Sequence, residues 1–142
     1  MPNKFQHQYQ IYYKKATADF VHVQQVVVLN NPLIDESILL FHLQQAAEKY
    51  LKSLLSFRNI HFAKLHDIKK ILDLFTEYGI ETPPNAEAFI ELTPYAVEGR
   101  YDLIVNDNID IHQFITLIDQ LKIFVEGIIF TTDAGNNFPC PP

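Results

Sequence analysis

The chain has 142 residues, 48% of them hydrophobic, and a formal net charge of −6 from 17 acidic and 11 basic side chains. This length and apolar content are typical of one folded domain and exclude a wholly disordered chain. The acidic balance argues against avid non-specific binding to nucleic acid, although it leaves a local basic patch open. A single cysteine permits no internal disulfide and no cysteine-based zinc site.

The ends and the apolar runs of the sequence predict a soluble, cytoplasmic protein. Residues 1–15 lack the apolar core of a secretory signal. No apolar run approaches the ~20 residues that a membrane-spanning helix needs. We therefore expect no association with a membrane.

The first predicted helix covers about residues 9–29. Its aromatic and apolar side chains recur at helical spacing: Tyr9, Tyr12, Tyr13, Ala16, Phe20, Val23 and Val27. The β-branched run at residues 26–29 resembles a strand, but its continuity with the upstream pattern favours a helix. Asn30, Asn31 and Pro32 end it.

The second predicted helix, from residue 34 or 35 to residue 57, organises the chain. Asp35 can serve as its N-cap. Two adjacent apolar lines run along it: Leu39, Leu43, Ala46, Tyr50, Leu54 and Phe57, and beside them Leu40, Ala47, Leu51 and Leu55. A helix with two such lines usually sits at the centre of a bundle. A polar stripe of Gln45, Glu48, Lys49, Lys52 and Ser56 occupies its opposite side.

Two shorter helical patterns follow a loop at residues 58–65. Asp67 can cap a third helix, which Gly79 ends and whose inward face is Ile68, Ile71, Leu72, Phe75 and Tyr78. Asn85 can cap a fourth stretch. Pro94 is expected either to kink this stretch or to begin a second short helix through Tyr95, Val97 and Tyr101.

The last predicted helix begins after Asp110, a suitable N-cap. Its inward face is Ile111, Phe114, Ile115, Ile118, Leu121, Val125 and Ile128. Residues 132–142 are rich in Gly, Asn and Pro and are expected to be a disordered tail. The sequence thus predicts one all-α domain over residues 1–131, an up-and-down helical bundle of four long helices plus a short or kinked fifth.

Three motifs in this chain, taken in order, resemble the HEPN domain (higher eukaryotes and prokaryotes nucleotide-binding). They are FHLQQAAEKYLKSLL at residues 41–55, LHDI at 65–68 and YAVEGRYD at 95–102. The resemblance covers roughly residues 9–131 and is to the stand-alone bacterial or archaeal type. It implies a bundle of four to five helices, usually a homodimer. Such proteins often act with a minimal nucleotidyltransferase encoded next door or fused.

Some members of this family are RNA-cleaving toxins whose partner nucleotidyltransferase is the antitoxin. Those RNases carry an Arg, four to six intervening residues and then a His. Arg100 matches the arginine by motif, but residues 105–107 are Val, Asn and Asp. Arg58 fares no better, because residues 63–65 are Ala, Lys and Leu. None of these side chains replaces an imidazole in proton transfer near neutral pH, which counts against catalysis.

Two groups of candidate ligand-binding residues lie on the central helix and just beyond it. The first is Gln45, Glu48, Lys49 and Lys52, whose lysines could hold a phosphate; the alternative is a solvated face or a dimer rim. The second is His66 and Asp67, which could orient a ligand. Alternatively, Asp67 is only an N-cap and His66 packs or bonds within the loop.

The third candidate group is Tyr95, Glu98, Arg100 and Tyr101. Arg100 offers a planar fork for a phosphate, and Tyr101 offers an aromatic face and a hydroxyl for a base or ribose. Alternatively, Arg100 forms a salt bridge with Glu48 or Glu98 inside the bundle. His42 is expected to be a packed, hydrogen-bonded histidine.

These observations support a non-catalytic HEPN-type module that homodimerises and binds a nucleotide, an RNA end or a nucleotidyltransferase partner. It would use no cofactor and no metal. The alternative is a metal-independent RNase toxin of a toxin–antitoxin pair, pairing Arg100 with Asn106, Asp107 or His66. A purely structural dimer is a third possibility.

Overall fold

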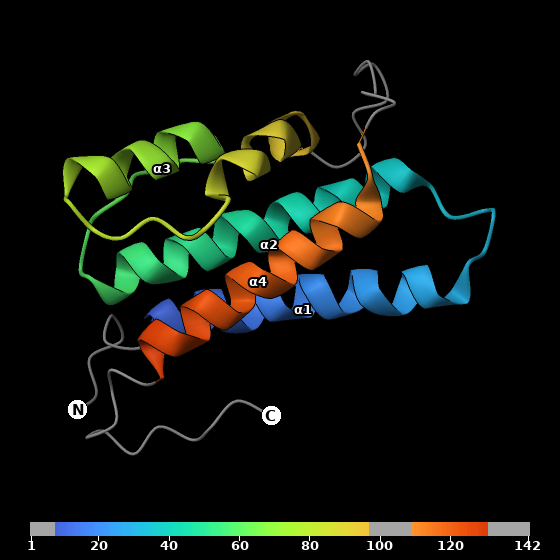
Figure 1. The fold of residues 1–142 in the computed structure, drawn as a ribbon, viewed down its shortest axis with the longest axis horizontal. Coiled ribbons are helices and arrows are strands. Elements are labelled where there is room, and N and C mark those ends of the chain that lie inside the picture. Colours follow the sequence, from blue (N-terminus) through green and yellow to red (C-terminus); the bar gives the residue numbers. More distant parts are fainter. Residues whose placement is uncertain (1–7, 97–108, 131–142) are drawn as a thin grey trace.

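A computed structural model describes residues 8–96 and 109–130, and these ranges are entirely helical or irregular. Figure 1 shows five helices in chain order. They are α1 (Gln8–Leu29), α2 (Glu36–Phe57), α3 (Ile68–Glu77), the 3-10 helix η2 (Ala86–Tyr95) and α4 (Ile111–Ile129). The predicted all-α bundle is confirmed, with α1, α2 and α4 as its long members.

Helix α2 is the centre of the bundle, as its two apolar lines predicted. Each of the other four helices packs against it. In Figure 1, α1 and α2 form an antiparallel hairpin, α4 lies across both of them, and α3 and η2 cover another side of α2. More than half of the residues of α2 are buried, including Leu43, Tyr50 and Leu51.

Three aspartates begin helices as the sequence predicted. In each case the carboxylate accepts a hydrogen bond of 2.9–3.0 Å from the backbone N–H two residues on: Asp35 from Ser37, Asp67 from Lys69 and Asp110 from His112. This geometry satisfies a donor that the first turn of a helix otherwise leaves unpaired. Gly79 follows the C-cap of α3 at φ +65°, a backbone conformation that a glycine adopts without steric cost.

Two expectations for the middle of the chain, for Asn85 and Tyr78, are wrong, and one of the two alternatives for Pro94 is excluded. Asn85 has φ +59° and its side chain makes no capping bond, because a capping side chain needs an extended backbone. Pro94 does not begin a new helix but lies inside η2. Tyr78 is 54% exposed, because it follows the last turn of α3 instead of continuing its inward face. Whether the chain kinks after Pro94 concerns residues outside the described ranges, as does the predicted tail at 132–142.

Two tyrosines connect the three long helices. Tyr13 of α1 donates a hydrogen bond to Glu126 of α4, and the Tyr50 hydroxyl lies 2.8 Å from Thr17 Oγ1 of α1. Burial raises the pKa of both phenols, and for Tyr13 the neighbouring Glu126 carboxylate raises it further. Both side chains therefore stay neutral in the folded protein at a pH where the unfolded chain already loses these protons.

This difference predicts a loss of stability in alkaline solution. Because the unfolded chain releases each proton near pH 10 and the folded chain holds it, the free energy of unfolding falls above that pH. Each tyrosine contributes at most about 1.4 kcal/mol per pH unit. Urea titrations between pH 8 and about 11 should give a shallower decline for Tyr13→Phe than for the parent protein. Tyr78→Phe is the matched control because the ring of Tyr78 is exposed. If stability declined as shallowly in Tyr78→Phe as in Tyr13→Phe, the effect could not be assigned to the buried phenol of Tyr13.

Candidate functional site

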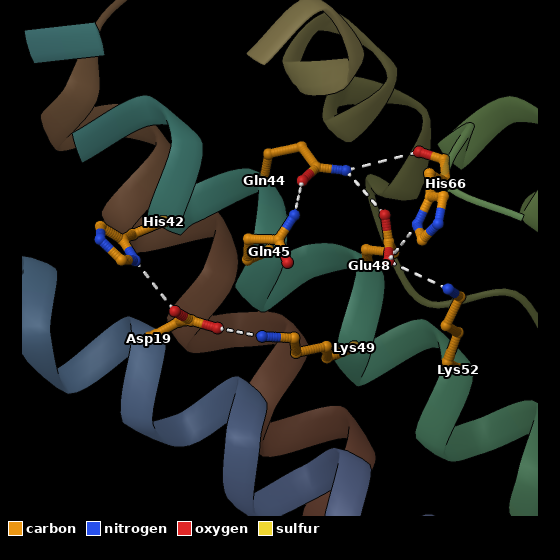
Figure 2. A network of polar contacts seen from close by, with 8 residues as sticks. All are labelled: Asp19, His42, Gln44, Gln45, Glu48, Lys49, Lys52 and His66. Atoms are coloured by element: carbon orange, nitrogen blue, oxygen red, sulfur yellow. Dashed lines mark hydrogen bonds and ion pairs between the residues drawn. The ribbon is translucent and has the colours of Figure 1, made fainter. Parts of the chain in front are cut away.

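Two residues of the polar stripe of α2 are buried inside the bundle, so the interpretation as a solvated face fails for Glu48 and Lys52, while Gln45, Lys49 and Ser56 stay partly exposed. Glu48 and Lys52 are 3% and 5% exposed. Gln44, which the sequence analysis placed in no functional group, is fully buried beside them. Figure 2 shows these side chains meeting His66, which comes from the loop before α3. The loop and α3 thus cover a side of α2 that periodicity alone assigned to solvent.

The carboxylate of Glu48 is the centre of this buried network. Its Oε1 accepts a hydrogen bond of 3.0 Å from Gln44 Nε2. Its Oε2 lies 3.0 Å from Lys52 Nζ and 3.2 Å from His66 Nδ1. Gln45 Nε2 donates to Gln44 Oε1 at 2.7 Å, which fixes the amide of Gln44 in turn. A buried carboxylate requires such partners, because an unpaired buried charge is very costly.

The ammonium of Lys52 is directed into the protein. It pairs with Glu48 and lies 5.7 Å from the centre of the Phe62 ring. His66 differs, because 67% of its side chain is exposed while Nδ1 contacts Glu48. The network therefore leaves His66 as its accessible member. Asp67 is the N-cap of α3, which agrees with the interpretation of this residue as a cap.

Lys49 belongs to a separate cluster between α1 and α2. Its Nζ lies 2.7 Å from Asp19 Oδ2, and His42 Nδ1 lies 2.9 Å from Asp19 Oδ1. The ring of His42 also packs against His22 with centroids 4.8 Å apart. The prediction of a packed, hydrogen-bonded His42 is confirmed. Figure 2 shows Asp19 joining the two side chains of α2.

Sequence reasoning missed two members of these networks, for different reasons. Gln44 stands four residues before Glu48, and this i, i+4 spacing is a signal that could have found it. Asp19 has no such signal, because its partners lie 23 and 30 residues away and meet it only through the packing of α1 on α2. Tyr95 is 5% exposed at the end of η2. Glu98, Arg100 and Tyr101 lie outside the described residues.

An aromatic cavity of about 320 Å³ opens beside the buried network. It lies between the start of α1 and the loop after α2, and Gln8, Tyr12, Ser56, Asn59, Ile60, His61 and Phe62 line it. The rings of Tyr12 and Phe62 lie 5.6 Å apart at 59°. Burial and the charge of Glu48 raise the pKa of Tyr12, so its hydroxyl stays protonated and can donate a hydrogen bond. None of the residues that line this cavity was a predicted ligand contact, although Ser56 was placed on the polar side of the same helix.

Metal binding and membrane insertion were also tested against the described ranges. Within residues 8–96 and 109–130, His, Cys, Asp and Glu side chains form no cluster able to hold a metal ion. No helix of the same ranges has the length and apolarity needed to cross a membrane.

Comparison with known families decides the wider classification. The model of the HEPN domain matches residues 10–128, which is most of the chain. The protein belongs to the HEPN family. Searches of curated proteins and of solved structures found no match. Family membership supports a role connected with nucleotides or RNA in general, and the five-helix bundle agrees with it.

The buried pair of this HEPN domain should be strongly coupled. We expect Glu48→Leu to lower the free energy of unfolding by about 3–5 kcal/mol, because it leaves the Lys52 ammonium buried without its carboxylate. Adding Lys52→Met should recover part of that loss, so the double variant is more stable than the sum of the single changes predicts. Urea unfolding of the four proteins measures this coupling.

The matched control is the pair of Lys69 and Asp73, which has the same i, i+4 spacing but side chains that are about 60% exposed. Its double-variant cycle should give little coupling, because water screens an exposed pair. Additive effects of the Glu48 and Lys52 substitutions would contradict the role assigned to burial.

Proposed function

We propose that this HEPN protein is a non-catalytic nucleotide- or RNA-binding module that holds a base in the aromatic cavity. The observation that carries the proposal is the lining of that cavity by Tyr12, His61 and Phe62. Its volume of about 320 Å³ falls within the range of small-molecule sites. Aromatic rings can bind any of the bases, because every base has a π-face on which to stack.

Polar groups around the rings supply the means of orienting a base. Gln8 and Asn59 carry amides that can both donate and accept hydrogen bonds, and Ser56 adds a hydroxyl. This combination of ring faces and amide edges is how single-stranded RNA bases are commonly held. Lys64 and His66 follow in the same loop and are exposed, so Lys64 offers a cation and His66 a ring nitrogen for hydrogen bonding to a phosphate.

The polar side chains of α2 take a supporting part in this proposal. Lys52 and Lys49 have their charges paired with Glu48 and Asp19, which makes them weak candidates for a phosphate. Lys52 nevertheless contacts Phe62, and Glu48 contacts His66. The buried network thus contacts the loop at Phe62, which lines the cavity, and again at His66, four residues farther along the chain. Arg100 and Tyr101 stay candidate contacts by motif alone.

The same proposal includes a homodimer that acts with a minimal nucleotidyltransferase partner, as the family resemblance implies. The first and last helices carry exposed apolar side chains that favour association, among them Ile11 and Ile123 at 49% and 60% exposure. On the polar side of α2, Glu48 and Lys52 are buried within the chain, which makes this side a weaker candidate for the dimer surface. The alternative function is an RNase toxin. This sequence lacks the histidine that the RNase motif requires after the arginine.

Thermal unfolding tests the binding site. We expect one of the four ribonucleoside monophosphates, or a short single-stranded RNA, to raise the melting temperature by about 5–10 °C at a concentration near 100 times its Kd. Tyr12→Leu and Phe62→Leu should each weaken binding about tenfold, since each removes a stacking face.

Tyr78→Leu removes an exposed ring of another helix and should leave the affinity unchanged. RNA integrity is followed in the same samples. An unchanged melting temperature with every ligand would reject the binding module. Cleavage that Arg100→Ala abolishes would establish the RNase alternative.

Sedimentation velocity tests the dimer separately. The proposal expects a particle of twice the 16.5 kDa chain mass at micromolar concentration. A monomer at that concentration would reject the homodimer, and ligand binding by that monomer would show that the nucleotide site needs no second copy.

A further inference from the structure

The turn that joins α1 to α2 exposes a cluster of large apolar side chains, here called the hairpin tip: Val28, Leu29, Leu33, Ile34 and Ile38. Their exposed fractions are 82, 73, 89, 36 and 38%. Single exposed apolar residues are ordinary, but five within an eleven-residue segment mark an interaction surface. Figure 1 shows this turn projecting at one end of the bundle.

A recess lies beside the exposed side chains. It has a volume of about 390 Å³ and opens between the hairpin tip and the start of α4; Val26, Val27, Ile34, Leu39, Ile109 and Ile111 form its apolar lining. Protein interfaces commonly concentrate their binding energy where a large side chain of the partner fills such a recess. The hairpin tip therefore combines exposed apolar side chains with a place for one anchoring residue.

The rim of this surface is acidic. Asp35 and Glu36 at the start of α2 and Asp110 at the start of α4 are all exposed. Glu36 and Asp110 also line the recess. Among the residues of the tip and of the recess lining there is no Lys or Arg, and His112 is the one basic side chain.

This charge pattern selects between two kinds of occupant. In a two-fold dimer built on the tip, the same patch of each subunit would face itself. The carboxylates of Asp35, Glu36 and Asp110 would then meet their own copies, with no Lys or Arg among the described residues of the tip and recess to compensate them, and like charges across an interface are costly. A partner with basic residues around an apolar face meets the tip without this penalty.

We propose that the hairpin tip docks an amphipathic helix of another protein, with its apolar face on Val28 and Leu33 and its Lys or Arg residues beside the acidic rim. This inference goes beyond the nucleotide-binding proposal and does not depend on it. The aromatic cavity lies at the start of α1 and the tip at its end. About 17 helical residues separate Tyr12 from Leu29, which is about 26 Å along the axis.

A designed peptide of about 18 residues, with leucines on one helical face and lysines on the other, serves as the probe. Fluorescence anisotropy should detect its binding to the full chain, with an affinity that falls as salt is added. Val28→Ser combined with Leu33→Ser should weaken binding about tenfold. Glu36→Lys should weaken it about threefold or more by reversing a rim charge.

Matched controls separate this site from general stickiness and charge. Tyr78→Ser removes an exposed ring elsewhere, and Glu77→Lys makes the same change in net charge on α3. Both should bind the probe as the parent protein does. A second peptide with glutamates in place of the lysines should bind at least about tenfold more weakly.

Four results would overturn the proposal, three from the binding assays and one from the oligomeric state. The three binding results are absence of binding to the lysine peptide, equal binding of the two peptides, and equal binding by the tip variants and their controls. Dissociation of a parent dimer by the Val28 and Leu33 substitutions would also overturn it, since the tip would then be a contact between two copies. Nucleotide affinity, measured on the same variants, should not change, so failure here is distinct from failure of the nucleotide site.

Discussion

The structure depends on the burial of one helix from several sides. Helix α2 supplies apolar residues to its contacts with α1, α3, η2 and α4, so its polar residues cannot all reach water. The carboxylate of Glu48 is the clearest consequence, because it is 3% exposed and must be paired. Gln44, Lys52 and His66 supply the partners, and His66 brings the loop before α3 into place. Packing of an apolar helix thus determines where a loop of the surface lies.

This arrangement places the surfaces available for binding at the two ends of the α1–α2 hairpin. At one end, Tyr12 of α1 and Phe62 of the following loop form the aromatic cavity, beside the paired Lys52. At the other end, the turn between the helices carries Leu33 and its apolar neighbours within an acidic rim. A ligand with ring faces suits the first surface and a basic amphipathic helix suits the second. The two proposed ligands thus use separate ends of the hairpin, and neither site blocks the other.

The polar stripe of α2 illustrates why sequence reasoning did not foresee the burial of Glu48 and Lys52. Helical periodicity puts Glu48 and Lys52 on the side opposite the apolar lines, and exposure is the usual fate of such residues. The ten-residue α3 and its preceding loop cover that side. No pattern within α2 contains this information, because the covering residue His66 follows Glu48 by 18 positions. For the same reason, Asp19 and the aromatic cavity appear only when segments distant in the chain are packed together.

What the sequence determined by itself was local. Apolar spacing at 3.6 residues per turn placed the long helices, and Asp35, Asp67 and Asp110 marked three helix starts, because a cap acts within two or three residues. The motif order indicated the HEPN family, and two apolar lines made α2 central. Only the tertiary structure decided which polar side chains are buried, which charges are neutralised and where the cavity opens. Those properties depend on spatial contacts between segments that are distant in the sequence, and the periodicity within one helix does not predict such contacts.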